Sequence, residues 1–299
     1  MKTIKQRISY AVMALVAMGF TACTQNEDMA PTLKGQEINV TFSVGGLQTR
    51  VNTLGAGNRW ENDDQINVRQ IYGDESTNTG KYQYIEENGL YHWEPIVRLR
   101  WEKVGRCELI AWYPSDMTNF PIYNLHTDQS DETQLKAADL ITGCWYDVPK
   151  DYVEIPMKHR MSLVTIVYHV GTADYPDMDI SEPQVYSKNN SVRFFSDQDQ
   201  GQFVMSTPSG NSDWVQACKH DGDMFSAIVI PGSYIKDERF LKFKIGDKNF
   251  YAKMKINTEF QEGKRYTYKL DVGKDKVELT RISIDDLKGW DSNNEEELK

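Results

Sequence analysis

Hydrophobic and polar residues alternate along most of the chain. The alternation is regular in four segments, in which every second residue is apolar or aromatic: residues 38–44, 241–245, 251–256 and 266–272. A period of two predicts β-strands with one face toward a core and the other toward water. The chain should therefore contain many half-buried strands, as antiparallel sheets do.

Three other runs are almost continuously apolar: residues 108–113, 163–168 and 227–230. They predict strands that are buried on both faces. Glycines interrupt the pattern at intervals of roughly ten residues, a spacing typical of antiparallel sandwiches. Helical periodicity is nearly absent. The short polar segment 130–140, in which Ser130 could act as N-cap, predicts a loop with at most two helical turns.

These patterns together predict an all-β protein with two domains in tandem. The best boundary from composition lies at residues 149–157, near the middle of the chain that follows the leader. It divides the chain into β-sandwiches of ordinary size, one over residues 38–155 and one over residues 156–299, the latter with an acidic tail.

The beginning of the chain predicts export and lipidation. Basic residues precede an apolar run, residues 8–20, that is too short to span a bilayer and has the length of a secretory signal. Two small residues and Cys23 follow the run. Together with Phe20, which stands where Leu is usual, they resemble a bacterial lipobox. We expect residues 1–22 to be removed as a signal peptide and Cys23 to be acylated. The alternative is a plain signal peptide that leaves Cys23 as an ordinary thiol.

Residues 23–37 predict a lipidated tether. The segment is polar and too poor in apolar residues to fold alone. Its acidic residues soon after Cys23 resemble the surface-export signal of lipoproteins from Bacteroidales, and the alternative is a solvated linker. The expected location is therefore the outer membrane, with the acyl chains of Cys23 in its lipid and the protein at the cell surface.

Charge excludes some classes of partner. The chain has a formal net charge of −10, with 44 acidic and 34 basic residues. A nucleic-acid-binding face needs an excess of basic residues, so we expect no nucleic-acid partner. The same charge disfavours attraction to anionic lipid through side chains.

Candidate catalytic and metal-binding residues do not form a recognisable motif. The sequence has no nucleophile elbow, P-loop, dinucleotide-binding glycine pattern or zinc-protease motif. The five histidines are scattered, and His159 and His169 are interpreted as partly exposed histidines beside one strand. Asp197, Asp199 and Gly201 resemble a calcium loop that lacks further ligands, so a polar turn is the better interpretation. Asp63 and Asp64 are explained by hydrogen bonding in a turn. We therefore expect no enzyme, cofactor or metal.

Three cysteines remain once Cys23 is acylated. In an oxidising compartment one pair could bridge, and Cys107 with Cys144 is the candidate pair, because both lie in the first domain. The favoured interpretation is that Cys107, Cys144 and Cys218 are three small buried hydrophobic residues.

Several short motifs together resemble the fimbrillin family, the lipoprotein pilins and pilin-like proteins of Bacteroidales. The match runs from Cys23 to residue 290 and consists of weak motifs in the family's order. They are Trp60-Glu61-Asn62-Asp63-Asp64-Gln65-Ile66-Asn67-Val68, Leu109-Ile110-Ala111-Trp112-Tyr113-Pro114, Ala138-Asp139-Leu140-Ile141, His159-Arg160-Met161-Ser162-Leu163-Val164, Ile228-Val229-Ile230-Pro231 and Gly263-Lys264-Arg265-Tyr266-Thr267-Tyr268. Asn62 and Asp63 depart from the family pattern, in which Gly often precedes Asp. The resemblance implies two transthyretin-like β-sandwiches.

The resemblance also implies a way of assembly. An arginine-specific protease would cut after Arg50, with Arg59 as the fallback site, and release the first strand, residues 38–47. The open groove would then be filled by a strand from the next subunit, through backbone hydrogen bonds and alternating apolar side chains. An ordinary polar loop around Thr49 and Arg50 is the alternative.

The donor strand is the weak part of this scheme. Residues 285–299 contain few apolar side chains among many acidic ones. Residues 277–284 are more apolar, but their alternation changes parity between Thr280 and Arg281, which predicts a bulge or a switch between sheets. If this segment completes its own domain, little of the chain is left to donate.

Two functions therefore stand. The first is a structural or accessory subunit of a fimbria, at its tip or anchor, that assembles with other pilin subunits by strand exchange and supports adhesion to a host or bacterial surface ligand. The second is a non-polymerising, lipid-anchored surface protein that binds a glycan or a host protein through aromatic residues such as Tyr91, Trp93 and Trp145. Core packing is the simpler explanation of these aromatic residues.

Overall fold

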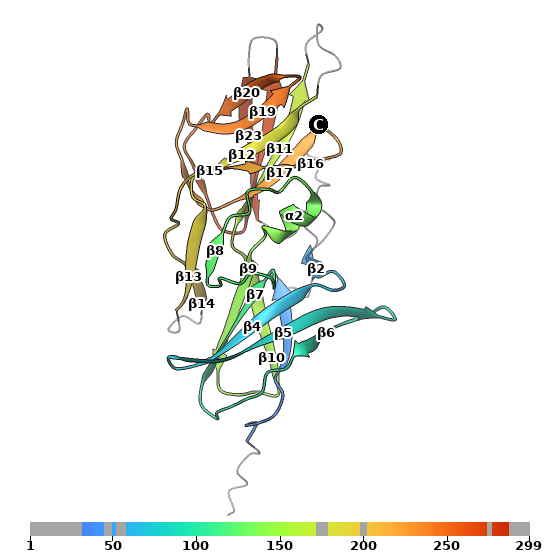
Figure 1. Ribbon diagram of the computed structural model, residues 1–299, viewed down its shortest axis with the longest axis vertical. Helices are drawn as coiled ribbons and strands as arrows, with labels where there is room; N and C mark the ends of the chain where they lie inside the picture. Colours follow the sequence, from blue (N-terminus) through green and yellow to red (C-terminus); the bar gives the residue numbers. More distant parts are fainter. Residues whose placement is uncertain are drawn as a thin grey trace, which may run out of the picture.

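A computed structural model describes most of the chain as two β-rich domains placed end to end along its long axis (Figure 1). The described part contains one short helix, and no helix in it is long and apolar enough to cross a bilayer. The described residues are 32–44, 50–51, 58–171, 179–197, 202–273 and 277–286.

The N-terminal domain is a single sheet of seven strands. All neighbours run antiparallel except the first two, which are parallel. The order across the sheet is β1 (Asn39–Val44), β10 (Tyr152–His159), β9 (Ile141–Asp147), β7 (Cys107–Tyr113), β4 (Gln65–Tyr72), β5 (Glu75–Glu87) and β6 (Leu90–Val97).

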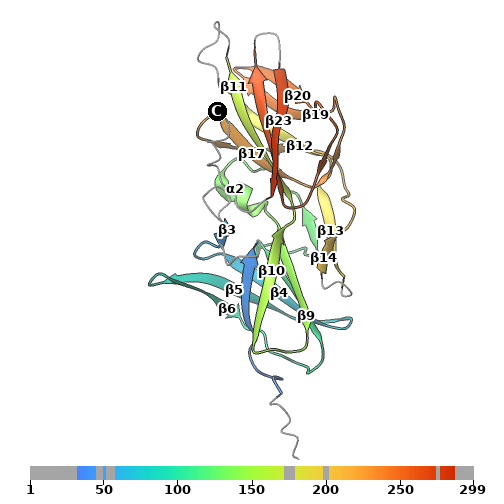
Figure 2. The same ribbon diagram turned by 180° about the vertical axis from the view of Figure 1, so that it is seen from behind.

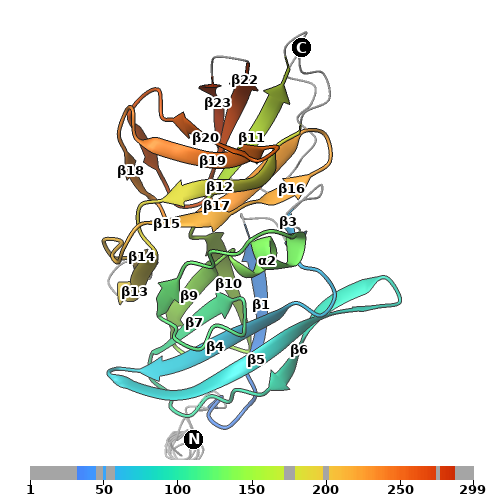
Figure 3. The same ribbon diagram turned by 45° about the horizontal axis from the view of Figure 1, so that its top comes forward.

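This sheet curls around its own core. β1 and β6 are its two edges, yet the rings of Phe42 on β1 and Trp93 on β6 have centroids only 4.8 Å apart. The two edge strands therefore approach each other across the curled sheet, while β1 lies beside β10 on its other side (Figure 3).

The C-terminal domain has two larger sheets that share one core. One three-stranded sheet, one two-stranded sheet and the short ladder of β2 and β3 complete the described strands. The five-stranded sheet is β16 (Cys218–His220), β17 (Met224–Val229), β11 (Ser162–Val170), β22 (Lys264–Val272) and β23 (Val277–Asp286), and the four-stranded sheet is β15 (Asp213–Gln216), β12 (Ser181–Ser187), β19 (Arg239–Ile245) and β20 (Lys248–Lys253). The three-stranded sheet is β14 (Gln202–Met205), β13 (Ser191–Asp197) and β8 (Ile122–Asn124), and the two-stranded sheet is β18 (Gly232–Tyr234) and β21 (Thr258–Phe260). The short ladder is β2 (Arg50–Val51) and β3 (Asn58–Arg59).

The two domains share a packed junction through β7. Every residue of β7 is buried: Leu109 and Ala111 belong to the N-terminal core, whereas Ile110 and Trp112 belong to the C-terminal one. The chain leaves the first sheet after β10 and enters the second at β11, so the expected boundary after residue 155 falls inside β10. Arg160, between these strands, donates to Thr142 (2.6 Å) and to Glu262 (2.9 Å) and so ties the two domains together.

The all-β class and the strands predicted from alternation are confirmed, with two local corrections. The helix α2 (Glu132–Ala137) begins one residue later than expected: the carboxylate of Asp131, not Ser130, accepts from the backbone N–H of Gln134 at 2.9 Å. The strand expected to reach residue 256 ends at Lys253, because the chain turns away and leaves Ile256 exposed.

Cys107 and Cys218 are buried as expected, Cys144 is half-buried, and all three are free thiols. Cys144 lies opposite Ile110 in the pairing of β7 with β9, and directly paired residues share one face of a sheet. Cys107 is an odd number of residues from Ile110 and therefore lies on the other face. The register thus keeps Cys107 and Cys144 apart, and the alternative of a disulfide between them is wrong.

Candidate functional site

β1 is the described strand on which the predicted assembly would depend. Alternate residues of the segment point into the N-terminal core: Ile38, Val40, Phe42 and Val44 are 3%, 6%, 3% and 1% exposed. Full burial of one such side chain contributes ~1.5–3 kcal/mol, so the four contribute roughly 6–12 kcal/mol. This range is comparable with the whole stability of a typical domain. The N-terminal domain cannot lose β1 without losing most of its stability or gaining a substitute.

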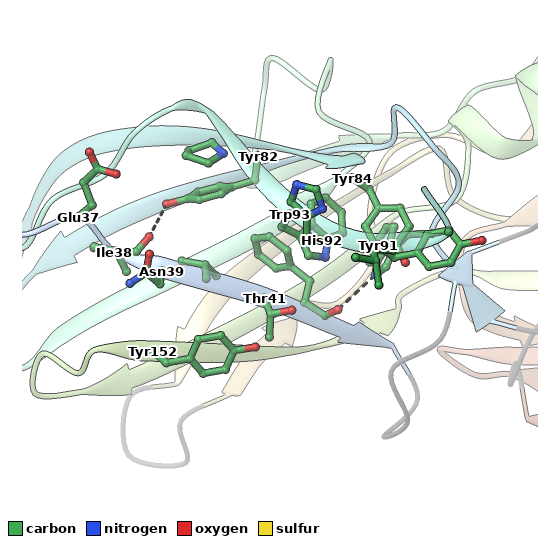
Figure 4. A pocket seen from close by; sticks show the side chains of 16 residues that line it. Glu37, Ile38, Asn39, Thr41, Tyr82, Tyr84, Tyr91, His92, Trp93 and Tyr152 are labelled. Atoms are coloured by element: carbon green, nitrogen blue, oxygen red, sulfur yellow. Dashed lines mark hydrogen bonds between the residues drawn. The ribbon is translucent and has the colours of Figure 1, made fainter. Parts of the chain in front are cut away.

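β1 is bound to the rest of the domain on both of its edges. One edge pairs with β10 in parallel, from Asn39 opposite Tyr152 to Val44 opposite Met157. On the other edge, side chains bind the backbone: Tyr82 donates its hydroxyl to the carbonyl of Ile38, and the indole of Trp60 donates to the carbonyl of Phe42, each at 3.3 Å (Figure 4).

On this second edge, the segment just before β1 is paired through backbone hydrogen bonds, which β1 itself lacks there in the described residues. Backbone N–H groups of Gly35 and Ile38 donate to the carbonyls of Trp101 and Leu99, at 2.6 and 3.0 Å. The carboxylate of Glu37 accepts from Arg98 (2.5 Å) and Arg100 (3.0 Å). The chain thus pairs with the segment that follows β6, whereas beyond Ile38 no backbone ladder joins the described residues of β1 to β6.

An open groove lies where β1 and β6 separate. Its volume is about 600 Å³, and its walls come from β1, β5, β6 and the first residue of β10 (Figure 4). Tyr91 and Trp93, two of the three aromatic residues proposed for ligand binding, line this groove. The third, Trp145, packs on Trp101 with ring centroids 5.7 Å apart and does not line it.

Trp60 is held by a turn that reaches the C-terminal domain. The backbone N–H of Glu61 donates to the carboxylate of Asp64 at 2.7 Å, which confirms the turn predicted for Asp63 and Asp64. Burial raises the pKa of Asp64, and the ammonium of Lys136 on α2, at 2.8 Å, acts in the opposite direction. α2 packs into the C-terminal core through Leu135, so this ion pair links the position of Trp60 to that core.

The predicted cleavage sites lie opposite each other. β2 and β3 form a ladder of two residue pairs, in which Arg50 lies opposite Arg59. The backbone at both arginines is therefore paired and is not the plain loop that the sequence suggested. Net stabilisation by one backbone hydrogen bond is only about 0.5–1.5 kcal/mol, so local opening of so short a ladder is easy. Cys23, the predicted lipid site, lies outside the described residues.

The candidate donor segment is part of the C-terminal domain. β23 pairs with β22 from Val272 opposite Val277 to Lys264 opposite Asp286 (Figure 2). The register skips Ile282, where Thr267 lies opposite Ser283 and Tyr268 opposite Arg281. The bulge predicted from the change of parity is confirmed within one or two residues, and the segment completes its own domain.

The remaining polar residues form structural contacts. His159 is buried, not partly exposed as expected, and its Nδ1 lies 2.9 Å from the carboxylate of Asp139. Burial raises the pKa of each of the three thiols, Cys107, Cys144 and Cys218, to about 11. At neutral pH these thiols are protonated and poor nucleophiles.

Trp60 and Tyr82 are the site residues that sequence reasoning missed. Trp60 opens the motif that resembles the family's tryptophan motif, but nothing in the sequence says that its indole caps a carbonyl of β1. Tyr82 sits in an alternating segment in which burial could be expected and the partner of its hydroxyl could not.

Comparison with known proteins gives a consistent result. The family model described as Fimbrillin-like matches residues 49–286. No curated protein matches the chain significantly. Solved structures of candidate cell adhesion proteins are similar in fold. One from Bacteroides uniformis has 17% identity and a TM-score of 0.57, and the match covers 77% of this chain and 93% of that one. One from Bacteroides ovatus has 16% identity and a TM-score of 0.58, and the match covers 84% of this chain and 98% of that one. A third, from Bacteroides fragilis, has 9% identity and a TM-score of 0.52 over 84% and 97%.

The family model covers most of the described part of both domains, and its extent agrees with the motifs quoted above. The family consists of structural and adhesion proteins and not of enzymes. The chain belongs to the fimbrillin-like family.

Proposed function

We propose that the protein is an exported fimbrial subunit in which β1 is exchanged for a strand of another subunit. The observation that carries the proposal is the nature of β1: an edge strand with three core side chains, directly preceded by a fourth at Ile38, that is joined to the sheet through one ladder. Removal of this strand would expose an apolar groove and the unpaired edge of β10. A strand from a partner with the same alternation would restore both.

The subunit is an accessory or terminal one. A shaft subunit must both accept a strand and donate one, so that assembly can continue head to tail. β23 is committed to β22, and the side chain of Leu279 within it is 2% exposed. The acidic residues after β23 offer few apolar side chains for a groove. The chain is therefore suited to accept a strand at an end of the fimbria.

Cleavage after Arg50 would release β1, with Arg59 as the fallback site. Both lie in the polypeptide that joins β1 to β4, so a cut at either one separates β1 from the remaining sheet. Before the cut, acylation of Cys23 would hold the exported chain at the outer membrane. Replacement Cys23→Ala should release the protein from the membrane fraction in a detergent partition, and retention of this variant there would contradict lipidation.

The N-terminal residue of protein sheared from the cell surface tests the proposal. We expect the recovered chain to begin at Val51 and to run in denaturant-resistant ladders with other subunits. The variant with both Arg50→Ala and Arg59→Ala should keep its N-terminal segment, and it should leave the ladders. A surface protein that begins at Cys23 and is always monomeric would instead support the non-polymerising, lipid-anchored binding protein.

A further inference from the structure

The groove between β1 and β6 is present while β1 is in place. It is distinct from the groove that removal of β1 would open, and the proposed strand exchange does not require it. It is lined by aromatic rings and by backbone, and its volume of about 600 Å³ lies within the ~300–1,000 Å³ typical of small-molecule sites. We propose that this groove binds a short neutral oligosaccharide.

Aromatic rings line both sides of the groove. Tyr91 is 38% exposed and stacks on Tyr84, with ring centroids 5.8 Å apart and planes at 12°. Trp93 continues this wall, and Tyr152, 56% exposed, lies across the groove beside β1 (Figure 4). The C–H faces of a sugar ring carry partial positive charge and pack against the negative faces of aromatic rings. The rings of Tyr84, Tyr91 and Trp93 suit one face of a flat, amphipathic ring, and Tyr152 lies at the rim on the side of β1.

The backbone of both edges points into the groove. Ile38 and Phe42 direct their carbonyls away from β10, and alternate residues of a strand point to the same side, so the N–H and C=O of Val40 do the same. On β6, the two-residue turn Asn88-Gly89 fixes the register and leaves Trp93 at a position that is not hydrogen-bonded to β5. Its backbone groups therefore face the groove. Sugar hydroxyls both donate and accept, which matches such paired donors and acceptors.

A peptide strand fits the groove less well than a sugar. The carbonyls that flank Val40 already accept from Tyr82 and Trp60, so a strand could pair with β1 at a single residue unless both side chains moved. On the other edge Pro95 has no N–H to offer. A saccharide needs only one donor–acceptor pair on β1, the backbone N–H and C=O of Val40 between the two capping side chains.

Charge selects a neutral sugar. The described residues that line the groove include no lysine or arginine, and the acidic Glu37 at its end is already paired with Arg98 and Arg100. A sialic or uronic acid would meet no free cation in the groove and would lose hydration without compensation.

Titration of the intact chain with named sugars tests this site. The variant with both Arg50→Ala and Arg59→Ala lacks both predicted cleavage sites and keeps β1 in place, so the result does not depend on processing. The probes are lactose, N-acetyllactosamine, cellobiose, mannobiose and maltotriose, with 3′-sialyllactose as an anionic comparison and a peptide of residues 277–286 as a strand. We expect at least one neutral sugar to bind with a dissociation constant of about 0.1–1 mM and to change the tryptophan fluorescence.

Variants locate the binding. Tyr91→Ala and Tyr152→Ala should each weaken the affinity at least about tenfold. The matched control is Tyr251→Ala, which removes a tyrosine of the same 38% exposure from the C-terminal domain and should leave the affinity unchanged. The proposal is overturned if no neutral sugar binds at about 10 mM, if both groove variants bind like the parent, or if the peptide or 3′-sialyllactose binds in preference to the neutral sugars.

Discussion

The replacement Phe42→Ala tests whether β1 is an integral part of the N-terminal core. The ring of Phe42 is 3% exposed and packs edge-on against Trp93 and Tyr82, with centroid distances of 4.8 and 5.8 Å. Truncation of a buried Phe to Ala costs about 3–5 kcal/mol, because apolar contact is lost and a cavity remains. A domain of ordinary stability has only about 5–15 kcal/mol in total.

The assay is urea unfolding followed by tryptophan fluorescence, to which Trp60, Trp93 and Trp101 of the N-terminal core contribute. The transition of the N-terminal domain should move to lower urea by an amount equivalent to about 3–5 kcal/mol. The matched control is Thr41→Ala, one residue away on the other face of β1, for which we expect less than about 1 kcal/mol. Equal and small losses for the two variants would refute the energetic role assigned to β1.

Two further outcomes follow from the contacts. Trp60→Phe keeps an aromatic ring but removes the donor to the carbonyl of Phe42, so it should lower the free energy of unfolding by about 1 kcal/mol and speed the proteolytic release of β1. An unchanged rate of release would contradict the capping role of Trp60. Burial raises the pKa of Cys107 from 9.0 to about 11, so at pH 8 Ellman's reagent should not label Cys107 in the folded chain, and diamide should not join it to Cys144. The folded thiols stay protonated while the unfolded ones ionise, so the free energy of unfolding should fall as pH rises from about 9 to 11. The fall should be smaller in Cys107→Ala. Rapid labelling of Cys107, or an equal fall in that variant, would argue against the burial of Cys107.

The sequence predicts well what depends on neighbouring residues. Alternation in residues 38–44 determines which side chains of β1 enter the core, because the period of a strand is local. The change of parity near Arg281 predicts the bulge in β23 for the same reason. The almost continuously apolar run 108–113 becomes β7, which is buried by a different domain on each face.

Contacts between distant residues could not be predicted in this way. β1 pairs with β10, more than a hundred residues later, and the parallel orientation leaves no mark in either segment. The caps that Trp60 and Tyr82 place on β1 depend on the curl of the whole sheet. The separation of Cys107 from Cys144 depends on the register of β7 against β9, and a shift of one residue would have brought both to one face.

The exchange of β1 is tested most directly by strand replacement in the purified, lipid-free chain. After cleavage with an arginine-specific protease, a fluorescent peptide of residues 38–47 is added, and a peptide with Val40→Asp and Phe42→Asp serves as the control. The labelled peptide should replace the cleaved strand with one-to-one stoichiometry and restore the unfolding transition of the N-terminal domain, whereas the control peptide should do neither. A cleaved chain that keeps its own strand indefinitely, or that takes up both peptides equally, would contradict an exchangeable first strand.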